Sequence, residues 1–507
     1  MIIANVAAAH SGGGGLQLAW QPCGNGAECT SIEVPVDWNR PGGRKITLAF
    51  ARHRASDPAT RIGTLVFQPG QGVSAMQFVA ARIGTGGFPA NLIARFDIVG
   101  IDQRGGGANP SFVDLDLPVR STALHCSMPA HEGGSRYFPT TPEEFEHLRD
   151  YNRVFALDCL ERSGPVVKHM DSLSQAHDLE AVREALGEHQ ISWLSWTTAS
   201  TVGTTYLSLY PRRVRAMVLD QPSDHSLAMK PYVRDHAAAV QDEFNRFAQW
   251  CANDRDCQLF GSDVHAALAN LVEAKNAVPI PPRQLSNPLS GDELLMLGQD
   301  MLGIGDLQTF VCGSVAATGF HVLAVAIDLG DPKCLPGIPG FDGLFAFENT
   351  YRDSIGWPNA WEQYHAISCG DFDTGIDGYW EFSALVGQLA RIAPDMRGVS
   401  PAWEVLSGCV GWPFRPGFPQ QRLDFPRQAN VMIVSSRHSE WAPYEHALRL
   451  QKQIRGSSLL TYEGDAHISY LSSRQCVRTW EQDYLVTLTA PAPGTTCPQE
   501  GPLAGKL

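Results

Sequence analysis

A regular alternation of apolar and amphipathic segments between residues 46 and 221 constrains the fold of this 507-residue chain more than any other feature. The apolar runs have the length of strands, and the runs between them have helical spacing, since Leu179, Val182 and Leu186 recur at i, i+3 and i+7. Strands that alternate with helices form a parallel sheet with helices on both faces. We therefore predict an α/β fold. The expected helix is Ser174–Gly187, and the expected strands are Thr64–Gln68, Phe96–Asp102, Ile191–Ser195, Val214–Asp220, Ala429–Ser435 and Ser458–Glu463.

The character of the chain changes between Asp224 and Arg397. Segments such as DHAAAVQDEFNRFAQWC and SDVHAALANLVEAKNAV read as helices, and stretches rich in Pro and Gly separate them. The run from Thr309 to Ile327 contains His321, two glycines and several hydroxyl side chains, which favours a buried helix over a membrane span. No clear strand alternation appears there, and we expect residues 225–397 to form a helical lid, inserted between two parts of the core, residues 1–224 and 398–507.

Composition excludes several classes of function. The net charge is −14 and Lys and Arg form no cluster, so we expect no nucleic-acid interface. No metal-ligand spacing occurs, and RGGGAN lacks the spacing of a dinucleotide fingerprint, so we expect no metal and no cofactor. We expect no membrane partner, and the oligomeric state stays open.

The chain has 12 cysteines, among them the close pairs Cys23/Cys29 and Cys251/Cys257. Neither pair has C-x-x-C spacing and no histidines cluster nearby, so disulfides are favoured over zinc. Disulfides indicate an oxidising compartment, while reduced buried thiols are the alternative. The first residues, MIIANVAAAHSGGGG, lack the basic start of a signal peptide, so the sequence leaves localisation open.

The five residues Ser195–Ala199 stand where a strand is predicted to turn into a helix. One large enzyme class keeps its nucleophilic serine at such a turn, in the pattern G-x-S-x-G. In this chain Ser195 and Ala199 occupy the glycine positions, and Thr197 occupies the serine position. Because Ser195 and Ala199 are small, a tight turn is still expected.

Several stretches together resemble a known family. They are AECTSIEVPVDWNRPGG, FQPGQG, FDIVGIDQRGGG, DLEAVREALGEHQISWLSW, VGTTYLSLYPRRVRAMVLDQ and, near the C-terminus, GDAH and CVRTWEQDYLVTLTAPAPGTTCP. In their order these stretches are similar to the actinobacterial secreted tripeptidyl aminopeptidase-like peptidases (S33 type) of the α/β-hydrolase fold. The resemblance covers nearly the whole chain and implies an α/β-hydrolase core with an inserted helical lid.

The resemblance also implies positions for the catalytic groups. Thr197 falls on the nucleophile, and His467, in Gly464–His467, falls on the histidine. The acid position of the family's D-x-x-T-P-Y stretch holds Ser439, with Glu440 beside it. The family's oxyanion loop falls on Gln68–Gly72, which is one residue shorter here and contains Gly70 and Gln71. The family's R-G-x-G-x-S stretch carries Asn109 in place of the serine. The resemblance therefore implies a degenerate triad.

The residue types limit the chemistry at this site. The Thr197 hydroxyl is able to attack if His467 takes its proton, but the extra methyl group crowds a strained turn. His467 can act as a general acid or base without a serine. Glu440 is the first candidate for the acid that orients it, and Asp220 and Asp224 are alternatives, because a triad depends on geometry and not on chain order.

Several neighbours are candidates for the oxyanion site or the pocket. Gln71, Thr198 and Asn109 can offer hydrogen bonds to a ligand, although surface or turn roles suit Gln71 and Asn109 equally well. Trp196 and Trp441 either line a pocket for an apolar ligand or fill the core.

Three functions follow in this order. The first is an α/β-hydrolase-fold enzyme repurposed for cyclisation, elimination, isomerisation or addition on a small organic molecule under the lid, with His467 as acid or base. The actinobacterial resemblance makes secondary-metabolite biosynthesis a natural setting. The second is an ester or peptide hydrolase that uses Thr197 or an activated water. The third is a non-catalytic protein that binds a small molecule.

Overall fold

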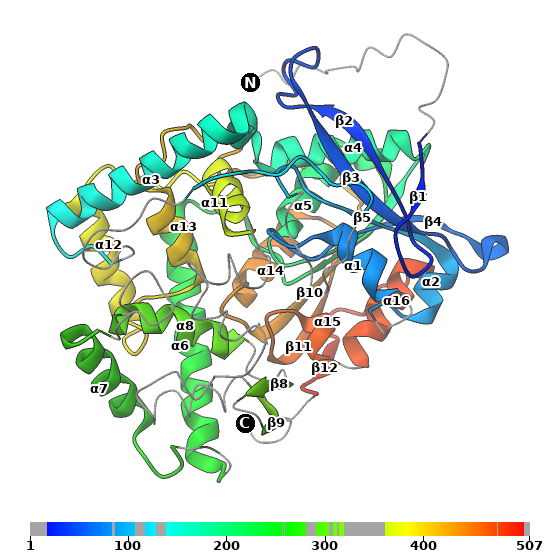
Figure 1. Cartoon of the computed structure of the whole chain (residues 1–507). Helices are drawn as coiled ribbons and strands as arrows, with labels where there is room; N and C mark the ends of the chain where they lie inside the picture. Colours follow the sequence, from blue (N-terminus) through cyan, green and yellow to red (C-terminus); the bar gives the residue numbers. More distant parts are fainter. Residues whose placement is uncertain are drawn as a thin grey trace.

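A large twisted sheet forms the centre of the molecule (Figure 1). The computed structural model describes residues 18–83, 87–106, 117–127, 138–255, 257, 259–279, 290–303, 308–311, 314–318, 360–473 and 475–500. The sheet has ten strands, which are, from one edge to the other, β1 (Gln21–Pro22), β2 (Glu28–Pro35), β3 (Lys45–His53), β5 (Phe96–Ile101), β4 (Gly63–Gln68), β6 (Ile191–Trp196), β7 (Val214–Asp220), β10 (Val431–His438), β11 (Ser458–Asp465) and β12 (Thr496–Pro498). The strands from β5 to β12 are parallel, and β1, β2 and β3 extend the sheet with antiparallel pairs.

Helices cover both faces of this sheet, which is why its parallel strands are apolar along their length. All residues of β6 are buried, and Trp193 and Trp196 point into the cores on opposite faces. The helices α1 (Ala75–Arg82), α2 (Ala90–Arg95) and α16 (Cys476–Thr487) cover one face, and α4 (Ser172–Ala185), α5 (Ala199–Leu209) and α14 (Tyr444–Gln453) cover the other. The predicted α/β fold with a mostly parallel sheet is confirmed.

The predicted core elements are present, with small differences at their ends. The helix expected at Ser174–Gly187 begins earlier, at Ser172, because the Asp171 side chain caps it by accepting a hydrogen bond from the Ser174 N–H. It ends just before Gly187, which has a positive φ of 72°. The six predicted strands correspond to β4, β5, β6, β7, β10 and β11.

A group of helices beside the sheet has a hydrophobic core of its own. Trp250 and Trp403 are almost completely buried in this core. The range 225–397 lies largely in this group, but helices from outside that range join it, so the exact boundaries of the lid remain a prediction. The members are α3 (Pro142–Ser163), α6 (Met229–Asn253), α7 (Val264–Ala277), α8 (Gly291–Gly303), α11 (Ala360–Asp371), α12 (Tyr379–Ile392) and α13 (Pro401–Cys409).

The expectation of a buried helix at Thr309–Ile327 is wrong for the part that the structure describes. Strands β8 (Gln308–Val311) and β9 (Ser314–Thr318) form an antiparallel pair there, so the predicted lid range contains strands. Short apolar runs do not distinguish a strand from a buried helix, and the β-branched residues in QTFV and SVAAT favour the strand. Residues 319–327 lie outside the described residues. None of the described helices has the length and apolar character needed to cross a bilayer.

Five disulfides join ten of the described cysteines. The two predicted pairs are confirmed, and three further bonds join cysteines that lie between 21 and 40 residues apart. The bonds are Cys23–Cys29, Cys126–Cys159, Cys251–Cys257, Cys369–Cys409 and Cys476–Cys497.

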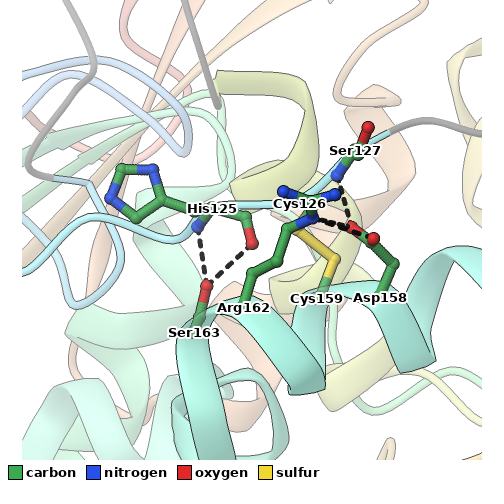
Figure 2. Close-up of a disulfide and its surroundings, with 7 residues drawn as sticks. All are labelled: His125, Cys126, Ser127, Asp158, Cys159, Arg162 and Ser163. Atoms are coloured by element: carbon green, nitrogen blue, oxygen red, sulfur yellow. Dashed lines mark hydrogen bonds and ion pairs between the residues drawn. A yellow bond between two sulfur atoms is a disulfide. The ribbon is translucent and has the colours of Figure 1, made fainter.

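Figure 2 shows how one of these bonds fastens a loop to the helical group. Cys126 lies in the segment 117–127, and Cys159 lies on α3. Beside the bond, the His125 N–H donates to the Ser163 hydroxyl at 2.7 Å, and that hydroxyl donates back to the His125 carbonyl at 2.9 Å. The disulfide and the paired hydrogen bonds hold the loop in one register against α3.

Candidate active site

The residues predicted for the site follow the carboxyl ends of neighbouring parallel strands. Gly70 follows β4, Thr197 follows β6, Asp220 ends β7, Glu440 follows β10 and His467 follows β11. Because β4, β6, β7, β10 and β11 are adjacent and parallel, these loops share one edge of the sheet. Ligand sites of open α/β sheets lie at this edge.

Thr197 adopts the backbone conformation of a nucleophile elbow. Its φ is +49°, a value that a β-branched residue rarely takes. The Thr197 N–H donates to the Asp220 carbonyl at 2.9 Å, and the Thr197 carbonyl accepts from the Ser200 N–H at 3.0 Å, at the start of α5. Strain of this kind is concentrated at functional sites. The sharp strand-to-helix turn is therefore present without its usual glycines and serine.

Small neighbours make room for this turn. Ser195 and Ala199 are completely buried on either side of Thr197, where larger side chains would meet the sheet and α5. Across the turn lies Gly70, with a φ of +126°, and a Cβ added to it would stand 3.1 Å from the Thr197 hydroxyl oxygen. The Thr197 hydroxyl thus faces the loop after β4, which is the loop predicted to carry an oxyanion site.

One hydrogen bond joins this loop to the elbow. The Gln71 N–H donates to the Thr198 hydroxyl oxygen at 3.1 Å. The Thr198 N–H itself has no acceptor among the described residues. In this fold an oxyanion is held by the N–H that follows the nucleophile position and by an N–H of the loop after the corresponding strand. In this chain the residues at these two positions are Thr198 and Gln71, and the structure shows the backbone N–H of Gln71, not its side chain, directed at the elbow.

His467 is a neutral imidazole in an apolar setting. Although part of the residue reaches the surface, protein atoms crowd the ring, and this desolvation lowers the pKa of His467 to about 4. The ring of Trp441 packs edge-to-face against it, with centroids 4.9 Å apart. Neither ring nitrogen of His467 has a hydrogen-bond partner among the described residues, and this includes the Thr197 hydroxyl.

The structure does not bring Glu440 to His467. The Glu440 side chain is buried near Glu243 of α6, whose pKa is raised by burial first and then by the negative charges of Asp465 and Glu440. The Glu440 carbonyl accepts a hydrogen bond from Nδ1 of His236, also on α6, at 2.8 Å. The predicted acid thus faces the helical group and does not orient the imidazole.

Asp220 accepts hydrogen bonds from the backbone of the loop that follows β11 and carries His467, here called the histidine loop. Its carboxylate accepts hydrogen bonds from the N–H groups of Ser469 at 3.3 Å and Tyr470 at 2.8 Å. Its carbonyl accepts the N–H of Thr197. Burial raises the pKa of Asp220 to about 7. One residue therefore holds both the elbow and the loop that carries His467, although it does not contact the imidazole.

Asp224, the other alternative acid, belongs to a different network. Its carboxylate accepts hydrogen bonds from the Ser226 hydroxyl at 2.6 Å and Gln453 at 3.1 Å, and it pairs with Arg449 at 3.3 Å. These partners leave it turned toward α14.

The aromatic candidates separate into two environments. Trp196 is 1% exposed and packs against Phe67, Phe78 and Tyr470, so it belongs to the core. Trp441 is partly exposed and its ring packs against His467. Asn109 lies outside the described residues.

Two contacts of the histidine loop were not predicted from the sequence. Gln221, with a φ of +56°, donates from its amide to the Ala466 carbonyl. Asp465 is buried and pairs with Arg246 of α6, with one N–O distance of 2.7 Å. The positive φ of Gln221 and the position of Arg246 give no signal in the sequence. Within the described ranges no group of three or more His, Cys, Asp or Glu side chains is placed to hold a metal ion.

Comparison with known proteins gives a consistent family. The protein-family model described as alpha/beta hydrolase fold matches residues 84–293, and the family model described as TAP-like protein matches residues 396–497. The chain is 27% identical to the protein named serine protease Hip1 of Mycobacterium tuberculosis over 95% of this chain and 91% of that protein.

Two further relatives extend this picture. The chain is 29% identical to the carboxylesterase B of Mycobacterium tuberculosis over 93% of this chain and 86% of that protein. It is 26% identical to the tripeptidyl aminopeptidase of Streptomyces lividans over 97% of this chain and 88% of that protein. With the parallel sheet and the elbow turn, these matches show that the chain belongs to the tripeptidyl aminopeptidase-like family of α/β-hydrolase-fold enzymes.

Proposed function

We propose that this chain is an enzyme that acts on a small organic molecule by proton transfer, with His467 as the acid or base and without an acyl-enzyme. Cyclisation, elimination, isomerisation and addition all fit this description, because each needs a placed base and no protein nucleophile. The observation that carries the proposal is the state of His467. It is neutral at pH 7, lies against Trp441 and has no carboxylate or hydroxyl partner among the described residues.

The geometry around Thr197 supports the same conclusion. A serine-type nucleophile needs a base that accepts its proton through a hydrogen bond. Thr197 and His467 form no such bond, and the Thr197 hydroxyl faces Gly70 instead. The carboxylates of Asp220 and Asp224 hydrogen-bond to other groups, and the buried Glu440 lies near Glu243 of α6. A charge-relay arrangement is therefore not part of the proposal.

Ester or peptide hydrolysis is the second candidate, and two observations favour it. Thr197 keeps the strained elbow turn, and the Thr198 N–H is unoccupied by any described acceptor. The relatives named above carry the names of a protease, an esterase and an aminopeptidase. Hydrolysis then uses Thr197 or a water molecule activated by His467. A non-catalytic binding role is the third candidate.

The test uses 5-nitrobenzisoxazole, a small apolar probe that reports general-base catalysis. A base removes its ring C–H proton, the N–O bond breaks, and a coloured cyanophenolate is released. We expect the protein to accelerate this reaction, His467→Gln to lower the rate at least about tenfold, and Thr197→Val to change it less than about twofold. His189→Gln is the control, because His189 lies in the loop before β6 at the opposite edge of the sheet.

The same variants separate the candidates. p-Nitrophenyl esters and tripeptide p-nitroanilides are tested in parallel. Hydrolysis that is lost in Thr197→Val establishes the second candidate. If His467→Gln alters neither reaction while thermal unfolding is unchanged, the protein is a binding protein.

A further inference from the structure

The hydroxyl of Thr198 accepts a hydrogen bond from a backbone N–H of the loop that holds the oxyanion in this fold. The Gln71 N–H is one of the two backbone donors of the site, and its acceptor is Oγ1 of Thr198, 3.1 Å away. The same oxygen would stand 3.9 Å from a Cβ added to Gly70. The side chain therefore extends from the elbow across to the loop after β4.

The second donor of the site is unoccupied within the described chain. The Thr198 N–H precedes the hydrogen bonds of α5, whose first turn begins with the bond from the Ser200 N–H to the Thr197 carbonyl, and it has no acceptor among the described residues. Thr198 thus has two roles. Its backbone N–H is a free donor, and its side-chain hydroxyl occupies the other donor, the Gln71 N–H. An intramolecular acceptor at the Gln71 N–H must be displaced before a substrate oxygen can use both donors.

We propose that Thr198 is a specificity-determining residue that suppresses acyl transfer by occupying the Gln71 N–H with its own hydroxyl. Loss of one oxyanion donor lowers acyl-transfer rates by about 10² to 10³. A site with one free donor still binds a neutral carbonyl or hydroxyl group through the Thr198 N–H. This inference rests on the proposed function, because it explains how the elbow is kept while the acyl-transfer chemistry is suppressed.

The test places a competent hydroxyl at the elbow and then varies only residue 198. A fluorophosphonate probe is used with the full chain carrying Thr197→Ser. In the labelling step the introduced hydroxyl oxygen forms a bond to phosphorus, the P–F bond breaks, fluoride leaves, and the hydroxyl proton passes to solvent water. The phosphoryl oxygen is the group that needs the two donors. Labelling is followed by intact-protein mass spectrometry over time.

The comparison is between Thr197→Ser with Thr198→Ala and Thr197→Ser with Thr198→Ser. The alanine removes the hydroxyl and frees the Gln71 N–H, whereas the serine keeps the hydroxyl acceptor and removes only a methyl group. We expect the alanine variant to label at least about tenfold faster than the serine variant. Equal rates in the two variants, including no labelling of either, overturn the inference, provided that both unfold at the same temperature as Thr197→Ser alone.

Failure of this inference can be distinguished from failure of the proposed function. Labelling of the unmodified chain at Thr197 contradicts the proposed function whatever residue 198 does. Faster labelling of the Thr198→Ala variant supports the inference even if 5-nitrobenzisoxazole is not a substrate.

Discussion

At the scale of single residues, the elbow depends on Gly70 as much as on Thr197. Gly70 has a φ of +126°, and a Cβ there would stand 3.1 Å from the Thr197 hydroxyl oxygen. We expect Gly70→Ala to lower the free energy of unfolding by about 2 to 3 kcal/mol, through backbone strain and this contact. Gly456→Ala is the matched control, because Gly456 also has a positive φ but no neighbour within 4 Å of the added Cβ. Urea unfolding of both variants checks the prediction, and equal losses would show that the contact with Thr197 has no role.

The environment of His467 includes one partly exposed aromatic neighbour. Trp441 packs against the imidazole, and desolvation lowers the pKa of His467 to about 4. We expect Trp441→Ala to admit water and to raise this pKa toward the ordinary value of about 6.5. The acidic limb of the pH-rate profile should then move to higher pH. Trp380, which is 77% exposed, provides the control Trp380→Ala. An unmoved limb in Trp441→Ala would show that other groups exclude the water.

At the scale of elements, Asp220 holds the end of β6 and the loop after β11 together. Its two carboxylate oxygens accept the N–H groups of Ser469 and Tyr470. Asn offers one acceptor oxygen, so Asp220→Asn should leave one of these buried groups unpaired and cost about 1 to 3 kcal/mol of stability. Hydrogen exchange at residues 466–473 should become faster. Asp224→Asn is the control, since Asp224 is equally buried but bonds to Ser226 and Arg449. If hydrogen exchange in this loop is equally fast in the two variants, the bonds from Asp220 do not specifically hold the loop.

Among the helices and strands, some were predictable from the sequence and others were not. The strands and α4 were predictable because buried parallel strands are continuously apolar and a half-buried helix repeats its apolar residues every three or four positions. The pair β8 and β9 was missed because its two runs are too short for periodicity to distinguish the two structures. The positions of Thr197 and His467 follow from the order of motifs. The bond between Gln71 and Thr198 joins residues 127 positions apart, and the bond from Tyr470 to Asp220 spans 250, so neither leaves a local pattern.

At the scale of the whole molecule, buried carboxyl groups determine how stability depends on pH. Desolvation by burial raises the pKa of five of them, namely Asp102, Asp220, Glu243, Asp371 and Glu481. In the unfolded chain carboxyl groups titrate near pH 4, so above about pH 6.5 only the folded state still holds these protons. Stability falls with rising pH wherever the folded state binds more protons than the unfolded state.

We therefore expect the temperature of thermal unfolding to fall between pH 6.5 and pH 8. The histidines whose pKa is lowered by burial, such as His225 and His236, have the opposite effect, but only below their unfolded value of about 6.5. Calorimetry in buffers of equal ionic strength checks the direction. A midpoint that stays constant or rises over this range would show that these carboxyl groups are ionised in the folded protein.

The protonation state of His467 distinguishes simple proton transfer from a charge relay, and titration of its imidazole is the decisive measurement. Protein labelled with ¹³C at histidine Cε1 is titrated by NMR, and His467→Gln identifies the signal. We expect a pKa near 4 for His467 and no strongly deshielded N–H proton, because no described carboxylate bonds to the ring. A pKa at or above about 6.5, with a deshielded proton that marks a bond to a carboxylate, would instead indicate a working charge relay and contradict the proposed function.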